Sequence, residues 1–305
     1  MDVNSTLSTV ISIFLLLLVG YGAKKVGVLS AKDSPVITSI IVNLALPSWI
    51  FTSVHGKKIS SDMIKAPFLF IAAEMAVMGL AYMAARVIRL DRRTTGALML
   101  VSVFGNTGFL GYPVVSAAFS HVASAMPTAV MVDQFAMQMM LGIVGVTVAA
   151  VFSGSEFECG RLFEFLKTPL FPTAVLALIL RNVHVPTMIL TTLGYLGAAT
   201  VPLAMISVGL GLSIGSIKQY PAALVTAVIL KMALLPALVV VAMRLVGITG
   251  IVNDVSTVLA ATPAAVLAGV MAARYGSNGA FAASAIALGT LISVVWIPVV
   301  LMLLH

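Results

Sequence analysis

Ten apolar stretches divide this chain, and they constrain its fold more than any other feature. Most of them hold roughly 20 apolar residues, the length that a helix needs to cross the hydrocarbon core of a bilayer. The sequence therefore predicts an all-α integral membrane protein with about ten transmembrane helices. We expect these helices at residues 7–25, 34–54, 64–88, 95–119, 127–152, 169–182, 187–214, 219–246, 254–274 and 278–303.

Composition agrees with a lipid environment. Of the 305 residues, 61% are hydrophobic and 9% are charged, whereas soluble domains carry about 25% charged residues. The net charge of +7 comes from bases scattered over short connections, so we expect the lipid bilayer, and no nucleic acid, as a partner. Cys159 is the single cysteine, which excludes a disulfide framework and a paired-cysteine metal motif. Residues 7–24 are expected to be a retained span, because no basic segment precedes them as in a signal peptide.

Lysine and arginine are distributed unequally between the two sides of the expected membrane. The positive-inside rule assigns the richer side to the cytoplasm. It thus predicts a multi-pass protein of the cell (inner) membrane, with both termini outside and the linker at 153–168 inside. The richer side holds Lys24, Lys25, Lys32, Arg86, Arg89, Arg92, Arg93, Arg161, Lys167, Lys218 and Arg274, and the other side holds Lys57, Lys58, Lys65, Arg181 and Arg244.

Proline positions recur across the two halves of the chain. Pro47 and Pro202 lie 155 residues apart, Pro67 and Pro221 lie 154 apart, and Pro113 and Pro263 lie 150 apart. Such a near-constant offset indicates an internal duplication. Because each half holds an odd number of spans, the second copy is inverted in the membrane, as in many secondary transporters. We expect a first five-helix repeat at 1–152, a cytoplasmic linker at 153–168 and a second, inverted repeat at 169–305.

The fourth and ninth expected spans each contain a run that disfavours a continuous helix. Gly105–Pro113 reads GNTGFLGYP, and Ala260–Ala264 reads AATPA. In a helix interior Gly costs about 1 kcal/mol and Pro about 3 kcal/mol, and broken backbone survives in a bilayer only where it lines a cavity or is buried in protein. We expect both spans to unwind at a transport site, with Thr262 as N-cap and Pro263 as the first residue of a new half-helix. Simple proline kinks in packed helices are the alternative.

These breaks supply the candidate substrate-binding residues. The N-terminus of a half-helix presents unpaired N–H groups and a positive dipole end, which favours an anionic substrate. No metal-binding residues are expected. The candidates at the breaks are Asn106, Thr107, Gly108, Pro113, Thr262 and Pro263, and the wall contacts expected near the prolines of the second and seventh spans are Asn43 and Ser207.

Three charged residues lie away from the ends of the expected spans. Glu74 lies midway along the third span and Lys231 midway along the eighth, 157 residues apart, and Asp133 lies in the fifth beside Gln134. A lone charge in a membrane is costly, so each needs a partner, water or loss of its charge. All three are candidates for proton or charge coupling. A structural pair between Glu74 and Lys231, and a polar packing contact or cap at Asp133, are the alternatives.

The residues at these positions also identify a family resemblance. The chain resembles the auxin efflux carrier family of PIN-like transporters, including its bacterial malonate-type members. The resemblance implies two inverted repeats, fourth and ninth helices that are broken and cross at Pro113 and Pro263, and a transport domain that moves against a scaffold like an elevator. The short central linker departs from the plant long-loop carriers and favours a prokaryotic-type member. The similar stretches are Asn43–Val54, Gly105–Pro113, Asp133–Gln134, Pro202–Ser213 and Thr262–Tyr275.

The function that follows is secondary transport. We expect a carrier that moves a small organic anion, a carboxylate such as malonate or an auxin-like molecule, by elevator-type alternating access. A sodium-coupled symporter of the bile-acid or sterol type and, further off, a channel are the alternatives. An enzyme is not expected, because HExxH, GxSxG and paired catalytic aspartates are all absent. We expect no cofactor, H+ or Na+ as coupling ion, and a monomer or a homodimer as the assembly.

Overall fold

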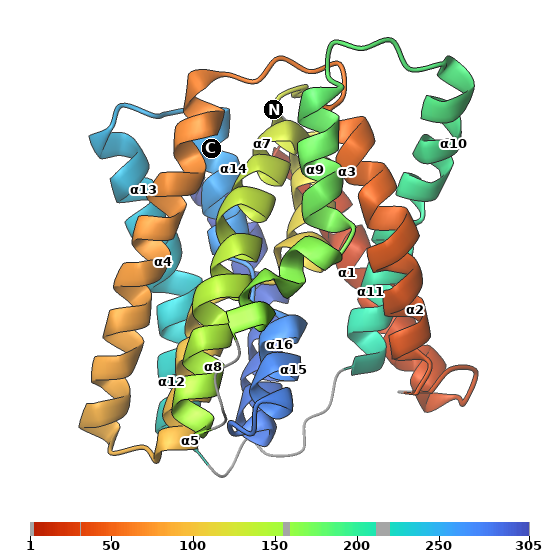
Figure 1. The fold of residues 1–305 in the computed structure, drawn as a ribbon. Helices are drawn as coiled ribbons and strands as arrows, with labels where there is room; N and C mark the ends of the chain where they lie inside the picture. The colour runs from red at the N-terminus through yellow and green to blue at the C-terminus, as the bar shows by residue number, and fades with distance from the viewer. Residues whose placement is uncertain (1–2, 31, 155–158, 212–219, 305) are drawn as a thin grey trace.

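The computed structural model describes residues 3–30, 32–154, 159–211 and 220–304 (Figure 1). Over these ranges the chain is helical, and the one β-type pairing is an isolated antiparallel bridge between Gly105 and Ala264. Lys218 and residues 155–158 of the expected linker lie outside the described residues.

The helices follow the apolar stretches of the sequence closely. In the first half they are α1 (Val3–Lys25), α2 (Ser34–Ile40), η1 (Ile41–Ala45), α3 (Leu46–Val54), α4 (Ser61–Ile88), α5 (Arg92–Val103), η2 (Thr107–Gly111), α6 (Tyr112–Ala118), α7 (Ala125–Val132), η3 (Asp133–Gln138), η4 (Leu141–Gly145) and α8 (Val146–Ser153). In the second half they are η5 (Cys159–Lys167), α9 (Leu170–Ile179), α10 (Thr187–Ala198), α11 (Thr200–Gly211), α12 (Pro221–Val228), η6 (Ile229–Leu234), α13 (Leu235–Leu245), α14 (Ile251–Ala260), α15 (Val266–Arg274) and α16 (Gly279–Leu304).

Six continuous helical stretches of the described chain are long and apolar enough to cross a membrane. The fold is therefore that of an all-helical integral membrane protein. The six stretches are Ser34–Val54, Ser61–Ile88, Ala125–Ser153, Thr187–Gly211, Pro221–Leu245 and Gly279–Leu304.

Local chemistry explains where several helices begin and where they tighten or widen. The Ser60 side chain accepts a hydrogen bond from the Met63 amide, and Asp91 does the same for the Thr94 amide, so both residues cap the helix that follows. The wide-turn segment η1 comes directly before Pro47, a residue that has no N–H to donate, and the Leu46 amide reaches back to the Ile41 carbonyl.

The helices pack as two bundles. The first holds α1, α2, α3, α9, α10 and α11, on the right of Figure 1, and the second holds α4, α5, α7, α8 and α12 to α16. Helix α6 lies between them and contacts both α1 and α7. Within the first bundle, α1 and α11 approach so closely that a Cβ at Gly20 or Gly209 would clash with the backbone of the other helix.

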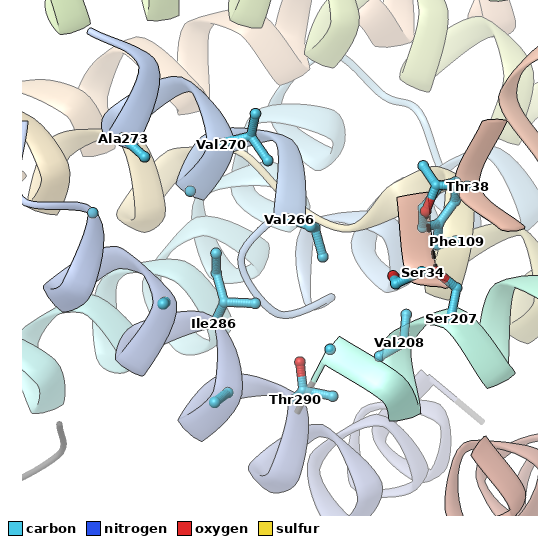
Figure 2. Close-up of a pocket in the computed structure, with 15 residues that line it drawn as sticks. Ser34, Thr38, Phe109, Ser207, Val208, Val266, Val270, Ala273, Ile286 and Thr290 are labelled. Carbon is cyan, nitrogen blue, oxygen red and sulfur yellow. Dashed lines mark hydrogen bonds between the residues drawn. The ribbon is translucent and has the colours of Figure 1, made fainter. Parts of the chain in front are cut away.

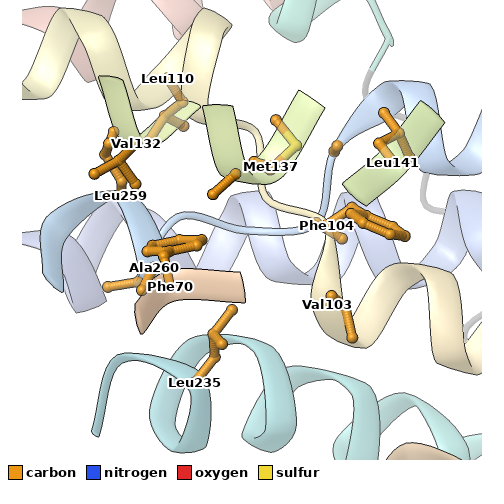
Figure 3. Packing of buried hydrophobic residues seen from close by; sticks show 14 of the residues in the cluster. Phe70, Val103, Phe104, Leu110, Val132, Met137, Leu141, Leu235, Leu259 and Ala260 are labelled. Carbon is orange, nitrogen blue, oxygen red and sulfur yellow. The ribbon is translucent and has the colours of Figure 1, made fainter. Parts of the chain in front are cut away.

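The second bundle has a densely packed interior. Phe70 of α4, Leu110 of η2, Leu235 of α13 and Leu259 of α14 are all completely buried or nearly so, and Figure 3 shows them to one side of Phe104. This packing surrounds the breaks in the fourth and ninth predicted spans, so the irregular backbone there is covered by protein. Both chain ends lie at one end of the molecule, opposite the turn that joins α4 to α5 (Figure 1).

Candidate functional site

The breaks in the fourth and ninth predicted spans meet in the middle of the second bundle. Helix α5 ends at Val103 and α14 ends at Ala260. The non-helical segments that follow these two helices run past each other. The Asn106 amide donates to the Pro263 carbonyl at 2.8 Å, and the Ala265 amide donates to the Phe104 carbonyl at 2.8 Å. We call this pair of extended segments, residues 104–106 and 263–265, the crossover. The two segments satisfy part of each other's backbone where neither is helical.

The sequence around the crossover leaves room for this close pairing. A Cβ at Gly105 would lie 2.6 Å from the Thr262 Oγ1 and 3.0 Å from the Lys231 Nζ, which no side chain tolerates without displacement. Pro263 has no N–H, so it can take part in the pairing only as an acceptor.

The predicted roles of Thr262 and Pro263 at the start of a half-helix are wrong. Thr262 instead lies just after the end of α14, and its hydroxyl donates back to the Leu259 carbonyl of that helix at 2.7 Å. The new half-helix α15 begins at Val266, with Ala265 in the N-cap position. The reason is that residues 263–265 are used in the extended pairing, so helical geometry resumes only after it.

Asn106 is the polar side chain of the crossover itself. Its backbone carbonyl accepts bonds from the amides of Leu110 and Gly111 at 3.1 and 3.0 Å, and so starts the helix that follows. Its side chain is 6% exposed, and the Nδ2 atom is buried without a hydrogen-bond partner. A buried donor left unpaired is costly, so this atom is suited to receive an acceptor from a ligand.

Thr107 and Asp133 join η2 to the fifth predicted span. The Thr107 hydroxyl donates to Asp133 Oδ1 at 2.5 Å, and Gln134 Nε2 donates to Asp133 Oδ2 at 2.7 Å. All three side chains are fully or almost fully buried. The Tyr112 hydroxyl lies near the same carboxylate. Asp133 therefore anchors the first helical turn after the crossover through its bond with Thr107.

Glu74 and Lys231 lie in the same buried region. The Lys231 Nζ donates to the Ala260 carbonyl at 2.5 Å, at the last residue of α14. Both oxygens of Glu74 are buried without a hydrogen-bond partner, and the charges that act on its carboxyl group are those of Lys231 and Asp133. The structure thus brings together the three charged residues that the sequence places on separate spans.

A cavity of about 320 Å³ lies between the two bundles, beside the crossover. Figure 2 shows Phe109 and Val266, the residues next to the two breaks, on its wall, with Ile286 and Thr290 of α16 below them. Ser207 of α11 lies on the cavity wall on the side of the first bundle. The volume of the cavity suits a small molecule, because ligand pockets have volumes from about 300 Å³ upwards.

The other predicted site residues lie outside the cavity wall, and these include the residues at the two breaks, Asn106, Thr107, Thr262 and Pro263. Asn43 is exposed, and its amide is bonded to the backbone and hydroxyl of Ser39. Pro113 is buried in α6, and Gly108 lies beside Leu46. Sequence reasoning missed Ser34, Thr38 and Thr290, because a hydroxyl on an apolar helix carries no distinct signal. The four-residue spacing of Ser34 and Thr38, which puts both on one helix face, was the one clue.

Comparison with known proteins decides the family. The sequence matches the membrane transport protein family over residues 5–155 and 161–301. The chain is a member of this family. An uncharacterized transporter of Methanocaldococcus jannaschii is 31% identical over 301 residues, covering 94% of this chain and 95% of the relative. An uncharacterized transporter of Methanothermobacter thermautotrophicus is 30% identical over 296 residues, covering 95% of each.

The family match confirms the resemblance to the auxin efflux carriers. Together with the two relatives, it shows that the protein is a transporter and not an enzyme. Across the described residues, no group of three or more His, Cys, Asp and Glu side chains is arranged to hold a metal ion. The crossover and the adjoining cavity are the candidate site of this membrane transport protein.

Proposed function

We propose that this membrane transport protein is a secondary transporter that moves a small organic anion, and that the anion's carboxylate binds at the crossover. The observation that carries the proposal is the unpartnered Nδ2 of Asn106, buried where the two broken spans pair beside the cavity. A carboxylate oxygen would supply the missing acceptor. The first turn of α15, whose leading amides have no partner within the helix, opens at Val266 on the cavity wall.

We further propose that all ten predicted segments cross the membrane as two inverted repeats, 1–152 and 169–305, joined by the linker at 153–168. The composition of the bundles supports this arrangement, because each bundle takes the same members from both halves. The first bundle holds the first two predicted spans of each half, and the second holds the last three, except that α6 of the fourth span lies between the bundles. In an elevator-type cycle the second bundle, which holds the crossover, would move against the first.

Positive-inside counting places both termini outside in this proposal, in the cell (inner) membrane. Three buried charged groups, Asp133, Glu74 and Lys231, are the proposed means of coupling, with H+ or Na+ as the driving ion and no organic cofactor. The Lys231 ammonium next to the crossover also favours an anionic cargo over a cationic one. Whether one chain or a homodimer carries out the cycle does not alter this site.

Uptake into liposomes tests the proposal. The purified protein is reconstituted, and uptake of radiolabelled malonate, butyrate and 3-hydroxybutyrate is followed with and without imposed pH, sodium and voltage gradients. We expect saturable uptake of at least one acid, loss of uptake in Asn106→Ala, and retained uptake in Asn43→Ala, whose exposed amide lies off the cavity. Gradient dependence identifies the coupling ion. If folded protein moves none of the three acids under any gradient, the carboxylate assignment fails.

A further inference from the structure

Three hydroxyl groups meet on the cavity wall where α2 and α11 pack together. The Ser207 Oγ lies 3.2 Å from the Ser34 Oγ and 3.1 Å from the Thr38 Oγ1, both within hydrogen-bond distance. All three residues line the cavity beside the crossover, and Figure 2 shows their side chains together at one edge of it. We call them the hydroxyl cluster.

The hydroxyl cluster differs from the other helical hydroxyls of this protein. Ser and Thr side chains within helices usually donate to the carbonyl four residues earlier, as Ser48, Thr226 and Ser284 do here. Among the bonds formed by the described residues, Ser34, Thr38 and Ser207 make none of this type. Their hydroxyls are bonded to one another across the α2–α11 contact and remain directed at the cavity.

The hydroxyl cluster retains hydrogen-bonding capacity. Each hydroxyl has one proton and can accept two bonds, so the two contacts within the cluster use two of its three protons. One donor and several lone pairs are left for a ligand. Thr290 of α16, in the second bundle, adds a further hydroxyl to the cavity wall (Figure 2).

Among the described residues, the rest of the cavity wall carries no charged side chain. Every described lining residue is neutral, and the surface facing the hydroxyl cluster is formed by apolar groups such as Val266, Val270 and Ile286. Lys24 reaches α11 but donates to the Leu210 carbonyl and is not part of the lining. A second carboxylate placed here would lose its hydration without meeting a cation, which is unfavourable. A neutral hydroxyl or carbonyl group would be hydrogen-bonded.

We propose that the hydroxyl cluster is a specificity subsite, and that the substrate is a monocarboxylate with a hydroxyl or carbonyl group away from its carboxylate. This inference rests on the proposed function, since it takes the carboxylate to be bound at the crossover. Among small carboxylates, the hydroxyl cluster selects against dianions, because it offers no cation to a second carboxylate. It also selects against purely aliphatic acids, because they leave its hydroxyls without a partner.

Three acids of equal carbon number test the subsite: 3-hydroxybutyrate, butyrate and succinate, each radiolabelled and presented to the reconstituted protein. We expect uptake of 3-hydroxybutyrate to exceed that of butyrate by about tenfold, the equivalent of one net hydrogen bond of about 1.4 kcal/mol, and to exceed that of succinate by more. In Ser207→Ala the ratio between 3-hydroxybutyrate and butyrate should fall towards one.

Ser284→Ala is the matched control, because Ser284 is equally buried but donates within its own helix. This variant should keep the wild-type ratio. A general loss of structure would lower the uptake of both acids together and leave the ratio unchanged. Equal uptake of all three acids, a preference for succinate, or an unchanged ratio in Ser207→Ala overturns the subsite while the carrier function stands. Absence of any uptake by folded protein overturns both.

Discussion

The Asn106 amide donates a hydrogen bond to the Pro263 carbonyl at 2.8 Å, and this bond connects backbone segments more than 150 residues apart in the chain. The pairing places the two helix breaks at one point in the second bundle. Backbone polar groups released by the breaks would be costly in a bilayer if left unpaired. Because the two breaks supply partners to each other, both can persist next to a cavity.

The first prediction concerns the space at Gly105. In Gly105→Ala the new Cβ would meet the Thr262 hydroxyl at 2.6 Å and the Lys231 ammonium at 3.0 Å. We expect a loss of stability of about 1–3 kcal/mol from overpacking, seen as a lower unfolding temperature in detergent, together with loss of uptake. Gly194→Ala is the control, because a Cβ there meets nothing within 4 Å. Equal unfolding temperatures for the two variants would contradict the tight packing.

A second prediction concerns the Glu74 and Lys231 side chains, both buried in the second bundle. Removing one member of a buried pair leaves an uncompensated charge and typically costs about 3–5 kcal/mol. We expect Glu74→Gln and Lys231→Met each to lower stability strongly, and the double variant to be more stable than the sum of the single effects predicts. Thermal unfolding of the wild type, the two single variants and the double variant gives the coupling energy between the two side chains. Strictly additive effects would mean that the two groups do not compensate each other.

The third prediction follows from the Asp91 cap of α5. Partial burial would raise the pKa of Asp91, but hydrogen bonds from Thr94, together with those from the backbone of Arg93 and of Asp91 itself, outweigh it and hold the pKa below the usual value of 3.8. Because the pKa is lowered in the folded state, the cap stabilises the fold fully at a pH above the unfolded-state pKa. This stabilisation is lost as the pH falls through the folded-state pKa. Asp91→Ala should therefore cost about 1 kcal/mol at neutral pH.

Unfolding temperatures measured from neutral to strongly acidic pH check this sign. The difference between wild type and Asp91→Ala should shrink as the acid limit is approached, because the protonated carboxyl is a weaker cap. Asp62→Ala, at an exposed carboxylate paired only with Lys65 across one helical turn, should have little effect at neutral pH. If the difference in unfolding temperature between wild type and Asp91→Ala became larger in acid, ionised Asp91 would not be the stabilising cap.

A fourth prediction concerns the linker segment η5. Phe165 packs over Gly142 of η4, where an added Cβ would come within 2.5 Å of the ring, and Glu164 pairs with Arg274 of α15 at 3.1 Å. Gly142→Ala should displace the ring and expose the segment, so trypsin should cleave after Lys167 more rapidly than in wild type. Glu164→Gln should change the cleavage rate less, since exposed ion pairs contribute about 1 kcal/mol or less. Unchanged cleavage in Gly142→Ala would show that Phe165 does not anchor the linker.

The sequence alone located the helices and the two breaks. The runs at Gly105–Pro113 and at Ala260–Ala264 combine residues that helices exclude, and the structure interrupts both spans there. These signals are local, since they depend on backbone freedom, on a missing N–H and on apolar length, all of which are properties of consecutive residues. For the same reason the family could be recognised from short stretches.

The tertiary structure decided which of these residues share a site. It brought Asp133, Glu74 and Lys231 behind the crossover, placed Ser207 with Ser34 and Thr38 on the cavity wall, and left Asn43 exposed. It also moved the start of α15 to Val266. Each outcome depends on how helices distant in the chain pack and rotate against one another, and that rotation is set by contacts which no stretch of consecutive residues contains.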